Sequence, residues 1–402
     1  MIEITPKENT SAYEVADIFR LYGQDYLSKN KLTRRQYAVM SAVQNCRTAS
    51  YGYHVDQCSA CGHIEQAFNS CRDRHCPKCQ GISRKKWIDA RLKDILPVPY
   101  YHAVFTLPHF LNNVISYNKR VIYELLLSSS SETLLTFGRD TKWLGGEIGF
   151  YGILHTWGQT LWPHVHVHYV VAGGALSDGG RWIKPEHDDK FLFPVHALSK
   201  VFRGKFIQGL KAAFACDRLK LPQRLSHLSA EDRFEHWIDQ LVSRNWVVYC
   251  KRPFADAASV VRYIGRYTHR VAISNNRIID VKNNDIRFLY KDYKASRVTW
   301  RQIALKSDEF IRRFIWHVLP NRFHKIRHYG FLANGRCRSK LKQIREILSS
   351  KAQDQFTPDE SVAMCPNCGK GELSPVMILR RIGYRVFCRF FVANPCMAYD
   401  TS

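Results

Sequence analysis

The segment from Trp162 to Gly174, WPHVHVHYVVAGG, restricts the fold more than any other stretch, because it alternates histidine with apolar residues. Successive side chains of a strand point to opposite faces, so Val165, Val167 and Tyr169 share one face. The other face carries three imidazoles, those of His164, His166 and His168. Buried imidazoles are costly unless each finds a hydrogen bond or a metal. The pattern therefore predicts an interior strand with a polar cluster on one face.

Histidines two positions apart on a strand project in parallel, a few ångströms from each other. Two of these rings can hold one cation through ring nitrogens, and the third ring or a group elsewhere would complete the coordination. The alternative is an exposed sheet face on which the histidines are solvated.

Strand-like and helix-like segments alternate along much of the chain. Strands are expected over residues 100–108, 145–158 and 246–254, helices over 11–45, 112–129, 200–243 and 256–270, and a hairpin over 277–290. The turn of that hairpin is expected at Asn283 and Asn284. This order predicts an α+β fold whose sheet has an antiparallel component and helices on one face.

The charge of the chain favours a polyanionic partner. Its 402 residues include 60 Lys and Arg against 35 Asp and Glu, a formal net charge of +25. Nucleic acid or an acidic membrane surface would match this charge. The sequence contains no apolar run of 18 or more residues, and its start lacks the pattern of a secretion signal. We therefore expect no membrane partner and a cytoplasmic location.

Cysteine pairs in a reducing compartment more often bind metal than form disulfides. Cys58 and Cys61 form one CxxC knuckle, and Cys76 and Cys79 form another after fourteen residues. Two such knuckles can close a tetrahedral Zn(II) site with four thiolates, so this spacing predicts one structural zinc. The alternative is a set of buried thiols. Further ligand types nearby are Cys71, His63 and His75.

Basic residues surround these cysteines and suggest contact with phosphates. The candidates for DNA binding here are Arg72, Arg74 and Lys78. A further CxxC pair, Cys365 and Cys368, lies near the other end of the chain. It indicates either a second Zn(II) site with unidentified partners or unpaired structural thiols.

Two tyrosines in the expected helix over 256–270 could act together with a metal. Tyr263 and Tyr267 are four positions apart, which puts their phenols on one helix face. A phenol is a weak nucleophile near its pKa of about 10, but a divalent cation on a phosphate assists the attack. The product would be a phosphotyrosine joined to one DNA end. Ordinary aromatic packing on an amphipathic helix is the alternative.

A basic segment follows, from Arg322 to Arg345, which contains no Asp or Glu and is interleaved with aromatic residues. Such a segment can hold a nucleic-acid backbone while aromatic rings stack on unpaired bases. We take Arg322, Lys325 and Arg327 as candidate DNA contacts. A solvated basic surface is the alternative.

These motifs together resemble the HUH endonucleases, named for a His-hydrophobic-His strand that is paired with one or two tyrosines on a helix. Within them the chain looks like the two-tyrosine rolling-circle transposases of the insertion-sequence-91 family. The resemblance rests on the His strand and on the segments NSCRDRHCPKCQ, FTLPH, LHTWGQ, YIGRYTHR and HVLPNRFHKIRHYGFL. It implies an HUH-type, RRM-like palm and an N-terminal zinc-binding domain with a helical arm.

The resemblance also implies roles for individual residues. The family's metal pair falls on His166 and His168, and its nucleophiles fall on Tyr263 and Tyr267. This chain has Val165 where the family usually has proline. His164 is therefore either the third ligand or a partner of a ligand, and His155 and Gln159 are weaker candidates for the third ligand.

The expected domains follow from this assignment. They are a helical arm (1–50), a zinc-binding and DNA-contacting module (51–95), the HUH catalytic domain (96–300) and a basic C-terminal region with a possible second zinc knuckle (301–402).

The implied reaction is transposition through single-stranded DNA with Mg(II) or Mn(II) at the histidines. One tyrosine would nick the transposon end and stay on the 5′ phosphate, and the free 3′ hydroxyl would be extended by the host replication machinery. The other tyrosine would cut a second strand and resolve the transfer, so the partners are single-stranded DNA at the transposon ends and target DNA. The protein would act at the bacterial nucleoid.

Two rival functions share part of these features. A rolling-circle replication initiator or relaxase has the same chemistry but acts at an origin. A non-enzymatic zinc DNA-binding regulator would use the His strand only as structure.

Overall fold

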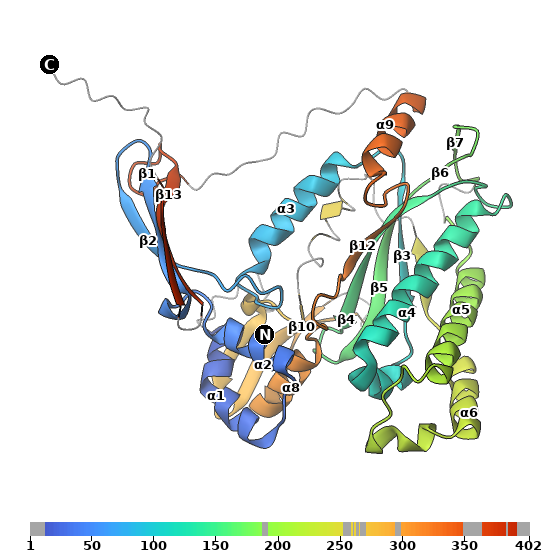
Figure 1. The fold of residues 1–402 in the computed structure, drawn as a ribbon, viewed down its shortest axis with the longest axis horizontal. Helices are drawn as coiled ribbons and strands as arrows, with labels where there is room; N and C mark the ends of the chain where they lie inside the picture. Colours follow the sequence, from blue (N-terminus) through green and yellow to red (C-terminus); the bar gives the residue numbers. More distant parts are fainter. Residues whose placement is uncertain are drawn as a thin grey trace.

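The computed structural model describes residues 13–186, 192–251, 259, 261–262, 265, 271–293, 299–348, 364–382 and 385–391. The fold is a mixed α+β architecture built on antiparallel sheets of five, four and three strands, with a further two-stranded ribbon (Figure 1). Within these residues, no helix is both long and apolar enough to cross a bilayer.

The five-stranded sheet has the strand order β12-β4-β5-β3-β8, and all its neighbouring strands are antiparallel. The strands are β3 (Tyr100–Thr106), β4 (Gly149–Trp157), β5 (Pro163–Ala172), β8 (Val248–Lys251) and β12 (Ile326–Gly330). The His strand is therefore the middle strand, which confirms its predicted interior position. The connections β3-α4-β4 and β5-α5-β8 each skip one strand, which gives a split βαββαβ arrangement with β12 added at one edge.

Helices α4 (Asn112–Arg139) and α5 (Val195–Ala215) cover one face of this sheet (Figure 1). Val165, Val167 and Tyr169 pack against them in the largest core, and the Tyr169 hydroxyl lies 2.7 Å from the Ser130 hydroxyl of α4. The two helices that connect strands of this sheet thus share one face, whereas other helices pack on part of the opposite face. The 3₁₀ helix η3 (Gln223–Leu228) and α6 (Glu231–Val242) extend this layer.

Among the described residues, helices cover only part of the opposite face of the sheet. Helices α3 (Gln80–Lys93) and α9 (Cys337–Ile347) lie near its upper end in Figure 1. Apolar residues of β4, β5 and α9 form a separate core there, including Tyr151, Val170 and Leu341. The histidines of β5 occupy the remaining part of this face, because they share the pleat of Val170.

A second core joins the start of the chain to a much later segment. Helices α1 (Val15–Lys29), α2 (Arg34–Gln44) and α8 (Ser307–Trp316) pack with a sheet of order β11-β10-β9. The strands of this sheet are β9 (Ile278–Lys282), β10 (Asp285–Asp292) and β11 (Thr299–Lys306). The Phe19 and Phe314 rings meet edge to face at 5.2 Å. The turn between β9 and β10 lies at Asn283 and Asn284, whose φ values of 50° and 66° fit a type I′ turn, so the predicted hairpin is confirmed.

The four-stranded sheet combines the two ends of the described chain. Its order is β14-β13-β1-β2, and its strands are β1 (Gly52–Cys58), β2 (Ile64–Phe68), β13 (Leu373–Ile382) and β14 (Arg385–Phe390). The pairing of β1 with β13 means that the expected module over 51–95 and the expected C-terminal region share one sheet. Of the helix predicted over 256–270, only Ser259, Val261, Arg262 and Gly265 are described, and all four are helical.

Candidate functional site

Three histidines gather on the open face of the five-stranded sheet, and we call them the imidazole cluster: His155 of β4 with His166 and His168 of β5. One ring nitrogen of each lies within 4.8 Å of the others. His155 is the direct cross-strand partner of His166, so both side chains emerge on the same face. The Nε2 atoms of His166 and His168 are 3.0 Å apart.

One hydrogen bond defines the tautomer of His166. Its Nδ1–H donates to the His164 carbonyl oxygen at 2.9 Å, and burial lowers the pKa of the ring to about 3. A neutral ring that is protonated at Nδ1 carries its lone pair on Nε2. His166 therefore presents a metal-binding nitrogen toward His168.

His168 has an orienting partner that the sequence reasoning missed. The Nε2 atom of His102 in β3 lies 2.8 Å from Nδ1 of His168. If His168 carries its proton on Nδ1, it donates to His102 and frees its own Nε2 for a metal. Burial lowers the pKa of His102 to about 4, and burial with His155 nearby holds the pKa of His168 well below its usual value. The sequence could have indicated this contact, because His102 lies in the strand that pairs with β5 and its side chain points to the same face of the sheet.

The geometry of the imidazole cluster fits a small divalent cation. Two ligands about 2.1 Å from an octahedral ion lie about 3.0 Å apart, whereas tetrahedral coordination separates them by about 3.4 Å. The observed 3.0 Å between the two Nε2 atoms is the distance of an N–H···N hydrogen bond and also fits two neighbouring ligands of one octahedral ion. The imidazoles of His166 and His168, whose pKa values burial lowers, supply lone pairs without a charge of their own.

The structure brings His155, and not His164, into this cluster. The Nδ1 atom of His164 lies 2.9 Å from Nε2 of His109, so that ring is held outside the group of three. The Gln159 side chain also points elsewhere, because its Oε1 accepts the Lys291 N–H at 3.5 Å. His155, the weaker candidate for a third ligand, therefore lies with His166 and His168 because β4 pairs with β5 at this register, whereas the ring of His164 does not.

The two tyrosines proposed as nucleophiles, Tyr263 and Tyr267, lie outside the described residues. Two of their described neighbours are packed: Val261 is fully buried, and a Cβ atom on Gly265 would come within 2.4 Å of Ile88 in α3.

The cysteines form two separate clusters of four. The first cysteine cluster consists of Cys46, Cys71, Cys76 and Cys79, and the second cysteine cluster consists of Cys58, Cys61, Cys365 and Cys368. The single site predicted from Cys58, Cys61, Cys76 and Cys79 is therefore wrong in its grouping. The reason is the pairing of β1 with β13, which places Cys58 opposite Leu373 and beside the C-terminal knuckle.

The sulfur distances in both clusters match tetrahedral zinc. The Sγ atoms of Cys46 and Cys79 are 3.5 Å apart, and those of Cys61 and Cys365 are 3.8 Å apart. Four thiolates about 2.3 Å from one Zn(II) lie about 3.8 Å from each other, whereas a disulfide would need about 2 Å. Backbone N–H groups also point at the sulfurs, as Gly371 does at Cys368, whose pKa this bond lowers to about 6.

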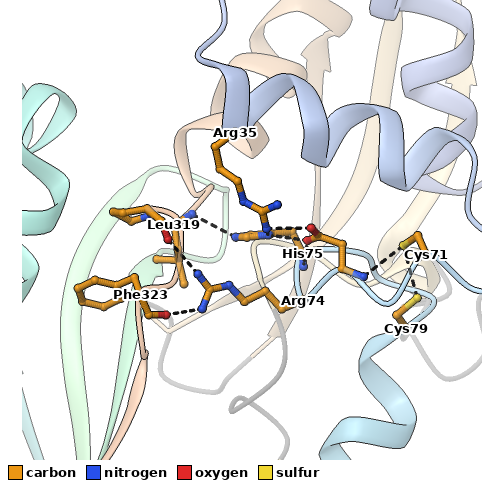
Figure 2. Close-up of polar contacts among 9 residues, drawn as sticks. Arg35, Cys71, Arg74, His75, Cys79, Leu319 and Phe323 are labelled. Carbon is orange, nitrogen blue, oxygen red and sulfur yellow. Dashed lines mark hydrogen bonds and ion pairs between the residues drawn. The ribbon is translucent and has the colours of Figure 1, made fainter. Parts of the chain in front are cut away.

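A polar network links the first cysteine cluster to the loop before β12 (Figure 2). His75 is fully buried, and its Nδ1 lies 2.7 Å from Asp73 while its Nε2 accepts the Leu319 N–H at 3.1 Å. Arg74 donates to the carbonyl oxygens of Pro320 and Phe323. His75 is therefore a structural residue and not a ligand of the cluster, and His63 also lies outside both clusters.

The six predicted DNA contacts have different surroundings. Arg72 and Arg322 are exposed. Lys78 pairs with Glu14, and Arg327 pairs with Glu124 at 2.7 Å. Lys325 is buried, which lowers its pKa to about 7. Arg74 is bound to the backbone near position 320. Of the six predicted DNA contacts, Arg72 and Arg322 are therefore the ones that are exposed to solvent.

Comparisons with known proteins agree with the sequence motifs. A family model described as "Putative transposase" matches residues 149–340, and one described as "Transposase zinc-binding domain" matches residues 18–107. The "Putative transposase y4qJ" of Sinorhizobium fredii (strain NBRC 101917 / NGR234) is 43% identical over 410 residues, covering 98% of this chain and 99% of the relative. The "Transposase for insertion sequence element IS801" of Pseudomonas savastanoi pv. phaseolicola is 28% identical over 306 residues, covering 75% and 72%. No solved structure matches the chain.

Proposed function

Because the chain belongs to the insertion-sequence-91 family of transposases, we propose that it cuts and transfers single-stranded DNA through a covalent 5′-phosphotyrosine. The observation that carries this proposal is the imidazole cluster, in which a His-Val-His strand supplies two ring nitrogens 3.0 Å apart. The buried, neutral state of these rings suits a cation site better than a solvated sheet face.

The topology of the sheet supports an HUH-type, RRM-like palm. The His strand is central, and both crossover helices lie on the face opposite to the imidazole cluster. In this assignment, His155, His166 and His168 hold Mg(II) or Mn(II), and His102 orients His168. When bound, the cation would neutralise charge on the scissile phosphate and orient the phosphorus.

The tyrosines would perform the covalent chemistry. The hydroxyl oxygen of Tyr263 or Tyr267 attacks the phosphorus and loses its proton, while the bond from phosphorus to the 3′ oxygen breaks. That oxygen takes up a proton and leaves as a 3′ hydroxyl, and the 5′ phosphate stays on the tyrosine. The new bond is a phosphodiester like the old one, so rejoining needs no ATP. A second tyrosine allows a second cleavage, as rolling-circle transposition requires.

The surrounding parts of the molecule would serve DNA binding. The two cysteine clusters would each hold Zn(II), and the net charge of +25 would attract the DNA backbone at element ends and target, in the bacterial nucleoid. Arg72 and Arg322 are the proposed phosphate contacts. The free 3′ hydroxyl would be passed to the host replication machinery.

Incubation of the protein with a labelled single strand from the element's terminus tests this proposal. In Mg(II) or Mn(II), we expect a covalent adduct on a denaturing gel that is lost in the double variant Tyr263→Phe, Tyr267→Phe. DNA binding without an adduct in either metal would favour a zinc-containing regulator instead. Adduct formation at a replication origin but not at element ends would favour an initiator.

A further inference from the structure

A cavity of about 690 Å³ opens beside the end of the His strand. It lies between η2 (His109–Leu111) with the first turns of α4 on one side and η3 with α6 on the other. Figure 1 shows α6 at the lower end of α5, on the side of the sheet that the crossover helices cover. The volume is in the range of small-molecule binding sites.

The inner part of this cavity is aromatic and apolar. The rings of Phe110 and Trp237 are stacked at 5.9 Å with an interplanar angle of 23°, and Leu228 is buried beside them. The Arg244 guanidinium lies 4.0 Å from the centre of the Phe110 ring. Because this guanidinium covers the Phe110 ring, a flat unpaired base would stack there by displacing the exposed Arg244 side chain.

The rim of the cavity is mostly basic. Arg224 and Arg233 are exposed there, with Asp232 as the acid that also lines the site. Among the residues that the structure describes, neither arginine has a carboxylate within ion-pair distance. Their charges are therefore available to a phosphate group.

Two hydrogen bonds connect this cavity to the imidazole cluster. His109 lines the cavity, and its Nε2 lies 2.9 Å from Nδ1 of His164. The carbonyl oxygen of His164 in turn accepts the Nδ1–H of His166 at 2.9 Å. His109 and His164 therefore lie between the cavity and the imidazole cluster, so a DNA strand that leaves the proposed metal site would pass these two side chains before it enters the cavity.

We propose that this cavity holds one unpaired nucleotide of the strand that crosses the proposed metal site, with its base on Phe110 and its phosphate at Arg224 and Arg233. The inference rests on the proposed function, because it assigns the substrate of the same site. A paired base cannot present its face to a side chain, so this cavity would select single-stranded over duplex DNA.

Binding of fluorescein-labelled (dT)12 to the full-length protein tests the phosphate contacts. The double variant Arg224→Gln, Arg233→Gln is expected to raise Kd about tenfold or more. The matched control is Arg139→Gln, Arg218→Gln, which removes the same charge at exposed positions outside the cavity and should change Kd less than about twofold. Equal weakening in both double variants would overturn the proposal, since it would reflect net charge alone.

The stacking contact is tested with a single abasic residue placed at successive positions of the terminus oligonucleotide. For the wild type, we expect the abasic residue to weaken binding about tenfold at one or two positions beside the cleavage site. Phe110→Leu should abolish that position dependence while keeping apolar contact with Trp237. A flat profile for the wild type would overturn the proposal.

Adduct formation and (dT)12 binding together distinguish failure of the nicking proposal from failure of the cavity proposal. A covalent adduct that forms normally in the Arg224→Gln, Arg233→Gln variant with unchanged Kd supports nicking and overturns the nucleotide cavity. Selective loss of (dT)12 binding in that variant, with no adduct from the wild type, supports the cavity and overturns nicking.

Discussion

At His166, one hydrogen bond decides which ring nitrogen can bind a cation. The His164 carbonyl accepts the Nδ1–H, so the Nε2 lone pair faces His168. His155 completes the group from the neighbouring strand, whereas the ring of His164 is engaged with His109. Identical side chains on one strand therefore have different roles, because their cross-strand partners differ.

This difference predicts opposite outcomes for two histidine variants. His155→Ala should weaken Mn(II) binding by at least about a hundredfold, because it removes a coordinating nitrogen. His164→Ala should leave the Mn(II) affinity within about tenfold, since the backbone carbonyl that orients His166 is retained. Titration followed by the Mn(II) EPR signal measures both, and the reverse ranking would restore His164 as the third ligand.

A buried histidine away from the cluster predicts how stability depends on pH. His317 is fully buried, its Nδ1 lies 3.1 Å from the Thr156 hydroxyl, and burial lowers its pKa to about 3. The unfolded chain titrates near 6.5, so below that pH the folded state binds fewer protons than the unfolded state. Its contribution is thus fully present at neutral pH and decreases as the pH falls from about 6.5 toward 3.

At about pH 5.5, one such histidine destabilises the fold by about 1.4 kcal/mol relative to neutral pH. His317→Gln should lower stability at about pH 7.5, because the hydrogen bonds of the ring are lost. It should also reduce the stability difference between the two pH values by about 1 kcal/mol. Urea unfolding at both pH values checks this, and an unchanged difference would mean that the titration of His317 does not contribute.

At the scale of elements, the first cysteine cluster is connected to the segment before β12 by side chains that are not ligands. Arg74 and His75 lie between Cys71 and Cys76 in the chain and contact the backbone near position 320 (Figure 2). The first cysteine cluster thereby supports the loop before β12, and β12 is an edge strand of the five-stranded sheet. A buried N–H group such as that of Leu319 needs its acceptor.

His75→Ala is expected to destabilise the protein by about 2–4 kcal/mol, because it leaves the Leu319 N–H unsatisfied and creates a cavity. The matched control His63→Ala, outside both cysteine clusters, should change stability by less than about 0.5 kcal/mol. Denaturant unfolding gives both values. The bound zinc should stay the same in both variants, and zinc loss on His75→Ala would identify this residue as a ligand.

At the scale of the whole molecule, distant parts of the chain are joined twice. Helices α1 and α2 pack on α8 and the three-stranded sheet, and β1 pairs with β13 across the second cysteine cluster. Structural zinc contributes its binding free energy directly to folding. Zinc in the second cysteine cluster would therefore stabilise the pairing of β13 with β1.

Two zinc ions per chain are expected by elemental analysis of the purified protein. Cys365→Ser should remove one of them and make β13 and β14 susceptible to limited proteolysis, because the β1–β13 pairing loses its metal support. Cys46→Ser should remove the other ion and leave that hairpin protected. A single zinc that is lost with either Cys58→Ser or Cys76→Ser would instead favour one site shared by those two knuckles.

The sequence by itself determined the features that depend on neighbouring residues. Alternation along Val165 to Tyr169 separated the apolar from the imidazole face, CxxC spacing identified paired metal ligands, and Asn283 with Asn284 marked a turn. Only the tertiary structure decided which cysteine pairs share a metal, whether His155 or His164 joins the imidazole cluster, and which basic side chains remain exposed. The reason is physical: periodicity reports the local direction of side chains, whereas these choices depend on the pairing of β1 with β13 and of β4 with β5, which no local pattern records.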